Sequence, residues 1–281
     1  MRVAYPLGKA IARRIPGGRK LAWGVYNLIT PDAERWINIH GASLLTNIHD
    51  NGIGTLLFLQ GGYASARVSE IRAAVNEGDV VVDIGANIGY FTVLLANLVG
   101  AKGKVYAIEP DPRNFALLQR TIERNNYSQV IAEQKAVSNK AGECSFYQTP
   151  SWTGNTLTAV EHTSVVKVEA VTLDALLRGE RQVSFVKMDM DGSEPLAVQG
   201  MGQLIQRSPN IRVLAEYEPG NLKRYLNDPL DFITIAEQNG LKLAAILDTE
   251  GGRLPELDLA PLRNLPDDKN LDLLFTTSTV E

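Results

Sequence analysis

Residues 80–92 constrain the fold more than any other part of the chain. They read VVVDIGANIGYFT, in which an apolar run ends in Asp83 and is followed by Gly85 and Gly89. A continuous apolar run of this kind is typical of a strand buried on both faces of a parallel sheet. The two glycines predict a tight turn into a helix, because glycine lets the backbone approach a ligand and pack closely. The segment therefore predicts a nucleotide-type loop on a parallel sheet.

The acid in front of this turn distinguishes between two kinds of cofactor. Dinucleotide sites carry the tighter GxGxxG turn, whose helix N–H groups bind a pyrophosphate. This chain has GxxxG, and a carboxylate at Asp83 would repel a pyrophosphate but would suit the cationic amino-acid end of S-adenosylmethionine (SAM). We therefore predict that the following residues bind that end of SAM: Asp83, Gly85, Ala86, Asn87 and Gly89.

Glu109 supplies a second indication of a nucleoside cofactor. It follows the next expected strand, residues 104–108, and lies directly before Pro110. An acid at this place can accept hydrogen bonds from both ribose hydroxyls of an adenosine, so we predict that Glu109 binds the ribose. NAD proteins share this acid. A nicotinamide-dependent oxidoreductase is therefore an alternative, and the missing GxGxxG turn disfavours it.

The order of strands and helices predicts an α/β fold with a doubly wound, mostly parallel, seven-stranded sheet. We expect strands at residues 80–84, 104–108, 130–134, 183–188, 211–215, 241–247 and 271–276. We expect helices at residues 65–75, 89–98, 112–125, 173–177, 194–206 and 230–238. Two further alternating strands, at residues 144–148 and 165–171, flank a polar stretch that is too long for a tight turn, and loops of that length are often functional lids.

A third group of polar residues follows two later strands. Lys187 and Asp189 share one side-chain parity at the end of the expected strand 183–188, and Glu216 follows the strand 211–215. Ligands of open α/β sheets bind at this carboxyl edge. Lys187 and Asp189 could polarise or deprotonate an alcohol, and Glu216 could be the base or only orient hydroxyls. We predict Lys187, Asp189 and Glu216 as catalytic residues without deciding which of the two acids is the base.

One structural alternative and one metal alternative remain for this group. The charges could form a structural ion pair, with Asp191 and Glu194 capping the next helix. The carboxylates of Asp189 and Glu216 could also hold a divalent metal through oxygen ligands. We predict no metal site, although a divalent metal is not excluded.

Residues 1–62 are predicted as an N-terminal extension to a main domain of residues 63–281. Residues 36–60 have the character of short strands, with a turn at 50–52. Residues 1–26 are basic and partly apolar, and form either a solvated helix docked on the domain or a segment that contacts an anionic membrane surface peripherally. No apolar run approaches the roughly 20 residues of a membrane span.

The amino-acid composition limits which partners and which cellular compartment we expect for this protein. The single cysteine, Cys144, excludes an internal disulfide and fits a reducing compartment. The formal charge of −4 argues against a broad nucleic-acid interface. We therefore expect a cytoplasmic protein, with a peripheral position at the inner membrane surface as the alternative, and no nucleic-acid partner; the oligomeric state is not predicted.

From about residue 62 to residue 218 the chain resembles the FkbM family of SAM-dependent methyltransferases, which have the class I methyltransferase fold. The segments that carry the resemblance are residues 78–92, Glu109-Pro110, Ala136-Val137-Ser138, Leu173-Asp174, residues 186–194 (VKMDMDGSE) and Glu216. The chain departs from the family pattern at Asp191, where the family usually has glutamate, and at Ala64, where it often has glutamate.

The resemblance implies an O-methyltransferase that acts on a hydroxyl of a sugar, a polysaccharide or a natural product. The backbone of Ala136, Val137 and Ser138 is then expected to lie against the adenine of SAM. The polar segment 149–164 becomes the candidate lid on the acceptor side, with His162 and with Trp152 either stacked on a sugar face or holding the loop in place. A SAM-binding module without catalysis is the main alternative, which the presence of Lys187, Asp189 and Glu216 disfavours.

Overall fold

The computed structural model describes residues 33–50, 52–149, 154–159, 161–162, 164–248, 252–254 and 257–277. The predictions made for residues 1–26 and for Trp152 lie outside these ranges. Within them, no helix has the length and apolar character needed to cross a membrane.

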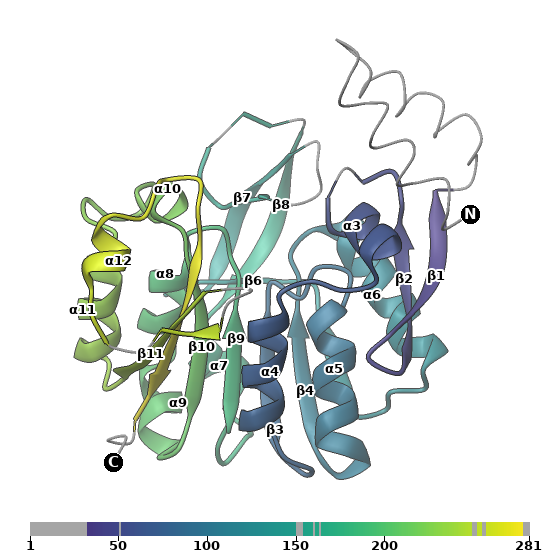
Figure 1. Ribbon diagram of the computed structural model, residues 1–281. Coiled ribbons are helices and arrows are strands. Elements are labelled where there is room, and N and C mark those ends of the chain that lie inside the picture. Colours follow the sequence, from purple (N-terminus) through teal and green to yellow (C-terminus); the bar gives the residue numbers. More distant parts are fainter. Residues whose placement is uncertain are drawn as a thin grey trace.

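A sheet of eight strands forms the centre of the molecule (Figure 1). Its order is β12-β11-β13-β10-β9-β3-β4-β5. The bounds are β3 Val80–Ile84, β4 Lys104–Ile108, β5 Val130–Glu133, β9 Phe185–Met188, β10 Arg212–Tyr217, β11 Lys242–Asp248, β12 Gly252–Arg253 and β13 Leu271–Thr276. Strands β5, β4, β3, β9 and β10 are parallel, and β13 runs antiparallel between β10 and β11. The predicted doubly wound sheet is confirmed. The structure has one strand more than the seven predicted, the two-residue β12 at the edge of the sheet.

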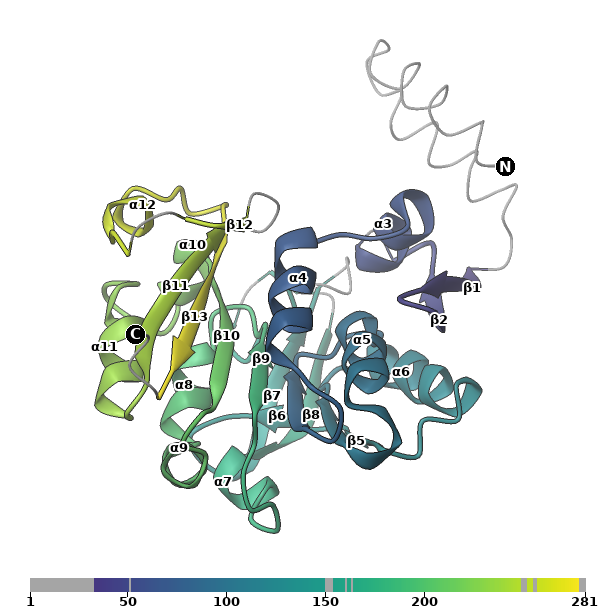
Figure 2. The same ribbon diagram turned by 60° about the horizontal axis from the view of Figure 1, so that its bottom comes forward.

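Helices cover both faces of this sheet, and alternate strand residues form two apolar layers. One layer packs Val81, Phe185 and Leu214 against the helices α4 (Ser65–Ala74), α5 (Tyr90–Val99) and α6 (Pro112–Arg124). The other packs their strand neighbours Val82 and Val186 against α8 (Glu194–Gln199), α9 (Gly202–Arg207) and α11 (Asp231–Gln238). Figure 2 shows α4 and α5 on one side of the strands, with α8 and α9 on the other. This two-sided burial explains why the parallel strands have continuous apolar sequences.

The segment before α4 contains a hairpin and a helix. Strands β1 (Glu34–Ile39) and β2 (Ala42–Asn47) pair antiparallel, and Leu44 and Leu45 of β2 are buried in the same apolar layer as α5. Residues 53–60 were expected as strand, but they form the helix α3 (Ile53–Gln60). The carboxylate of Asp50 accepts N–H bonds from Gly52, Gly54 and Thr55, so the turn residues begin a helix here. The domain boundary at residue 62 stays a prediction.

A second, three-stranded sheet lies beside the main one. Its order is β6-β8-β7, with bounds β6 Ala136–Val137, β7 Gly142–Gln148 and β8 Ser164–Val171. The antiparallel pair β7–β8 confirms the two alternating strands expected around the polar stretch. The remaining short helices are η1 Gly100–Lys102, α7 Leu173–Leu176, α10 Pro219–Leu222 and α12 Ala260–Arg263.

The single helix expected at residues 194–206 is wrong, because the chain breaks it into α8 and α9. A Cβ atom at Gly200 would lie 2.3 Å from the carbonyl oxygen of Ser138, so only glycine fits where this turn meets β6. The carboxylate of Asp174 then accepts N–H bonds from Gln203 and Leu204 and stabilises the start of α9. Both helices still cover the same face of the sheet.

Candidate functional site

A cleft of about 330 Å³ opens at the carboxyl ends of β3, β4, β9 and β10. It gathers segments that are far apart in the sequence. Its lining includes Tyr63, Gly85, Ala86, Asn87, Phe91, Glu109, Ala136, Val137, Gly154, Asn155, Thr156, Leu157, Lys187, Asp189, Asp191, Glu216 and Glu218. A larger cavity of about 540 Å³, beside Asn76, Asp79 and Arg212, contains none of the predicted residues. The carboxyl-end cleft is therefore the candidate site.

Gly85 allows the loop after β3 to contact the loop after β9. Its φ angle is +67°, and a Cβ atom there would lie 1.9 Å from the carbonyl oxygen of Asp189. Any other residue would push apart the loops after β3 and β9. The backbone N–H groups of Gly85 and Ala86 both donate to the carbonyl of Ile108, which fixes the loop against β4.

Glu109 closes the other side of this loop. Its carboxylate accepts the backbone N–H of Asn87 at 2.8 Å and that of Asp111 at 2.8 Å. The side chain is 5% exposed and lines the cleft. Burial raises the pKa of Glu109 to about 7, although the two N–H donors favour the charged form. Each oxygen retains acceptor capacity for a ligand hydroxyl.

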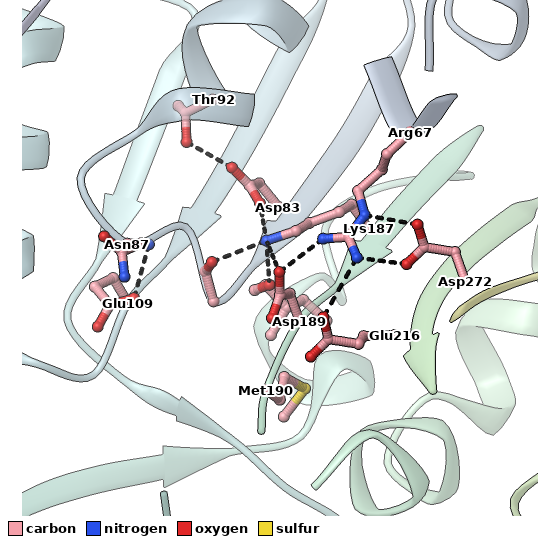
Figure 3. Close-up of polar contacts among 12 residues, drawn as sticks. Arg67, Asp83, Asn87, Thr92, Glu109, Lys187, Asp189, Met190, Glu216 and Asp272 are labelled. Atoms are coloured by element: carbon pink, nitrogen blue, oxygen red, sulfur yellow. Dashed lines mark hydrogen bonds and ion pairs between the residues drawn. The ribbon is translucent and has the colours of Figure 1, made fainter. Parts of the chain in front are cut away.

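Asp83 and Lys187 form a buried pair on neighbouring strands. The two residues lie opposite each other in the β3–β9 register, with 3.2 Å between the Lys187 Nζ and the Asp83 Oδ1. Asp83 is fully buried and also accepts a hydrogen bond from the Thr92 hydroxyl at 2.7 Å. The Lys187 ammonium donates to the carbonyl oxygens of Ile84 and Gly85. Lys187 therefore stabilises the loop of residues 85–89, which we call the glycine loop, by donating to the carbonyl groups at its start (Figure 3).

A row of carboxyl groups continues across the same face of the sheet. Asp189 follows β9, Glu216 lies on β10, and Asp272 lies on β13 directly opposite Glu216. Carboxylates that face each other directly repel, so such a row requires a cation.

Arg67 of α4 provides that cation. Its guanidinium donates to Asp189 at 2.8 Å, to Asp272 at 2.9 and 2.5 Å, and to Glu216 at 3.4 Å. Only 4% of the Arg67 side chain is exposed. Figure 3 shows the guanidinium between the three carboxyl groups. We call these four residues, Arg67, Asp189, Glu216 and Asp272, the carboxylate row.

Asp111 joins the cofactor side of the cleft to the loop after β7. Its carboxylate accepts hydrogen bonds from the side-chain amides of Gln148 and Asn155, each at 3.0 Å, and from Arg113 at the start of α6. Asn155 belongs to the short described segment 154–159, of which residues 154–157 line the cleft. His162 instead packs edge-on against Tyr147 and is absent from the lining.

The structure places most of the predicted site residues in the cleft. Three of the predicted cofactor residues do not line it: Asp83, which is buried behind Lys187; Gly89, where a Cβ would lie 2.9 Å from Leu118; and Ser138, whose N–H donates to Val171. The roles of all the predicted site residues remain predictions.

Sequence reasoning missed Arg67, Asp272 and Tyr63. Asp272 could have been noticed in the sequence, because it is an acid inside the otherwise apolar strand β13. Helix α4 has charged residues on several sides, so nothing local marked Arg67. Tyr63 lines the cleft, and burial, followed by the charge of Asp189, raises the pKa of its hydroxyl well above the usual value.

The carboxylate row also bears on the metal alternative. Among the residues that the structure describes, no group of acids, histidines and cysteine is arranged to hold a metal ion. The guanidinium of Arg67 occupies the position between Asp189 and Glu216 that a shared cation would take. The positive charge between these two acids therefore comes from the guanidinium of Arg67.

Comparison with known proteins shows which family this chain resembles in sequence. The profile of the Methyltransferase FkbM domain matches residues 83–240, which include the glycine loop, Glu109 and the carboxyl groups at 189 and 216. The 31-O-demethyl-FK506 methyltransferase FkbM of Streptomyces tacrolimicus is 45% identical over 65 residues, covering 23% of this chain and 24% of that protein. Methyltransferase 1 of Beauveria bassiana is 28% identical over 145 residues, covering 43% of this chain and 57% of that protein.

Among solved structures, the methyltransferase FkbM from Methylobacillus flagellatus KT aligns over 97% of this chain and 58% of its own, with 16% identity and a TM-score of 0.46. The chain covers 28% and 27% of the first two curated relatives, protein-L-isoaspartate O-methyltransferases of Methanococcoides burtonii and Methanothrix thermoacetophila. The profile match extends over more than half of the chain and over the strands that build the cleft. The chain belongs to the family of methyltransferase FkbM domains.

Proposed function

We propose that this protein is a SAM-dependent O-methyltransferase. One observation carries the proposal: a single cleft combines a glycine loop and a buried acid suited to a nucleoside with two carboxyl groups, Asp189 and Glu216, suited to a hydroxyl. Family membership supports methyl transfer.

In this proposal SAM lies along the carboxyl ends of β3 and β4. The ribose hydroxyls donate to Glu109, and the backbone of Gly85, Ala86 and Asn87 surrounds the amino-acid end. Ala136 and Val137 lie beside the adenine. Asp83 contributes its charge from behind the loop and acts through Lys187, because its own side chain is fully buried.

The reaction is a displacement at the sulfonium methyl group. The acceptor oxygen forms a bond to the methyl carbon while the carbon–sulfur bond breaks and leaves its electron pair on sulfur. The hydroxyl proton passes to a carboxylate at the carboxyl end of β9 or β10. Much of the rate enhancement comes from holding the acceptor oxygen in line with the methyl group. Lys187 acts as a positioning residue for the loop.

The acceptor is a hydroxyl of a sugar, a polysaccharide or a natural product. The name of the Streptomyces tacrolimicus relative describes a methyltransferase for 31-O-demethyl-FK506, which supports an oxygen acceptor. Residues 154–157, which belong to the predicted lid, line the cleft, and we expect them to border the acceptor's path. Absence of a nucleic-acid partner and a cytoplasmic position stay predictions.

Isothermal titration with SAM and with NAD, followed by transfer of a labelled methyl group to a panel of glycans and small alcohols, tests the proposal. We expect SAM to bind, NAD not to bind, and label to appear on at least one hydroxyl compound. Binding of NAD without SAM would support the oxidoreductase alternative. Binding of SAM with no transfer across the panel would favour a non-catalytic module.

A further inference from the structure

We infer that Arg67 determines which acid of the carboxylate row is the base: it holds Asp189 as the charged carboxylate facing the acceptor and leaves Glu216 protonated as a neutral hydrogen-bonding group. The inference rests on the proposed function and decides between the two candidate bases. It also assigns a positioning role to Arg67, a residue outside the segment that matches the family profile.

The balance of charges requires a bound proton. On the α4 face of the sheet, four buried or largely buried carboxyl groups, Asp83, Asp189, Glu216 and Asp272, surround two cations, Lys187 and Arg67. A buried charge without a partner is costly, so the group is expected to neutralise by taking up a proton.

The geometry indicates which acid takes up the proton. Asp272 receives two bonds from Arg67, and Asp189 receives one at 2.8 Å with the Lys187 ammonium 4.0 Å away. Glu216 has the longest contact with Arg67, at 3.4 Å, and it also accepts a hydrogen bond from the neutral amide of Asn270 at 2.6 Å. Glu216 is thus the acid least compensated by positive charge.

The surrounding charges act in the same direction. Burial and the charges of Asp189, Glu194 and Asp191 raise the pKa of Glu216 well above its usual value, against the attraction of Arg67. Burial opposes the charge of Asp189, but Lys187 and Arg67 outweigh it and lower the pKa of Asp189. Burial also raises the pKa of Asp272, which does not line the cleft and has 1% of its side chain exposed.

The exposed fractions fit this division of roles. Asp189 has 29% of its side chain exposed, compared with 10% for Glu216, and both line the cleft. The Asp189 carboxylate accepts the hydroxyl proton during transfer and then releases it to solvent. Net, SAM and the alcohol give the methyl ether, S-adenosylhomocysteine and one proton.

Infrared difference spectroscopy of the ligand-free protein tests the protonation state without using catalysis. We expect the protonated-carboxyl absorption of the wild type to lose one component in Glu216→Gln and to keep it in Asp189→Asn. The components of Glu109 and Glu194, whose pKa values are also raised, remain in both variants. An unchanged protonated-carboxyl absorption in Glu216→Gln, or the loss of the same component in Asp189→Asn, would overturn the inference. Neither result depends on finding the acceptor, so a failed methyl-transfer assay is distinguished from a failed inference.

Kinetics on an identified acceptor tests the division of roles. Glutamine reproduces a neutral Glu216, so Glu216→Gln should lower kcat less than about tenfold, whereas Asp189→Asn should lower it roughly 100-fold or more, the usual contribution of a general base. Arg67→Lys loses the forked contacts and should move the acidic limb of the kcat–pH profile to higher pH.

Arg253→Met is the matched control for Arg67. It removes the ion pair between Arg253 and Glu70, which also ties α4 to the sheet but lies away from the cleft. We expect it to leave kcat and its pH profile unchanged. Equal losses in Glu216→Gln and Asp189→Asn, or an unmoved acidic limb in folded Arg67→Lys, would contradict the assignment.

Discussion

Glu109 illustrates at the residue scale how burial adapts one carboxyl group to its ligand. In the ligand-free protein its pKa is raised to about 7, chiefly by burial. The folded state therefore holds this proton more tightly than the unfolded state. Its contribution to stability is complete below the ordinary value of 4.5 and is lost as the pH rises through about 7. Ribose hydroxyls, as donors, favour the charged form.

The affinity for SAM should accordingly rise with pH. Below about pH 7, Glu109 must lose its proton when SAM binds, so the Kd should fall by up to roughly tenfold per pH unit. Titration calorimetry at pH 6, 7 and 8 measures this, and Glu109→Gln should bind more weakly with a flatter pH dependence. Glu194, also buried with a pKa raised to about 7, remains in that variant. An undiminished slope in Glu109→Gln would assign the proton to Glu194.

The buried pair of Asp83 and Lys187 makes a second prediction at this scale. Lys187→Met leaves the Asp83 carboxylate buried without its cation, which should lower the free energy of unfolding by about 3–5 kcal/mol. Urea denaturation measures the change. The control is Lys223→Met, which breaks an exposed pair with Asp267 and should cost at most about 1 kcal/mol. Similar losses in the two variants would show that the buried pair has no special importance.

At the scale of elements, local sequence patterns predicted most of the fold. The strands at 80–84 and 104–108 were predicted with their observed bounds, because two-sided burial imposes a continuous apolar sequence. The break at Gly200 was missed because the group packed against that glycine, the carbonyl of Ser138 just after β6, is far away in the sequence. The helix at 53–60 was missed because three backbone N–H bonds to Asp50 convert a turn signal into a helix start.

The link between Asp111 and the 154–157 segment can be tested at this scale. Asn155→Ala removes the amide that ties this segment to the start of α6. We expect the KM for the acceptor to rise roughly tenfold, equivalent to about 1.4 kcal/mol, a normal value for a hydrogen bond to a charged group. Steady-state kinetics at saturating SAM measures it.

Asn139→Ala is the matched control for this variant. It removes an exposed amide contact with Gln199, away from the cleft, and should leave the KM unchanged. An unchanged KM in Asn155→Ala would show that the segment does not contribute to binding of the acceptor.

At the scale of the whole molecule, the carboxylate row is the part that the sequence could not provide. Asp189 and Glu216 were predicted because each follows an apolar strand. Their cation comes from α4, more than a hundred residues earlier, and Asp272 comes from the last strand of the sheet. Such a group depends on the order of the strands and on the docking of one helix. Neither leaves a local pattern, so the electrostatics of the site follow from the assembled sheet.

The assembled sheet should also respond to its cofactor as one unit. Loops from β3, β4 and β9 all border the cleft, and both apolar layers pack on the same strands, so a ligand there binds only the folded state. At 100 times its Kd, SAM should add about 2.7 kcal/mol, or roughly 5–8 °C in Tm for a chain of this size. Differential scanning calorimetry measures the shift.

NAD at the same concentration is the comparison ligand, and Gly85→Ala is the comparison variant. The variant forces a Cβ atom against the Asp189 carbonyl and separates the loops that border the cleft, so its own Tm should fall and the SAM-dependent shift should disappear. The shift should be a single displaced transition in the wild type, because β3, β4, β9 and β10, which border the cleft, belong to one sheet. A shift with NAD equal to that with SAM, or a full SAM shift in folded Gly85→Ala, would mean that the ligand binds away from the glycine loop.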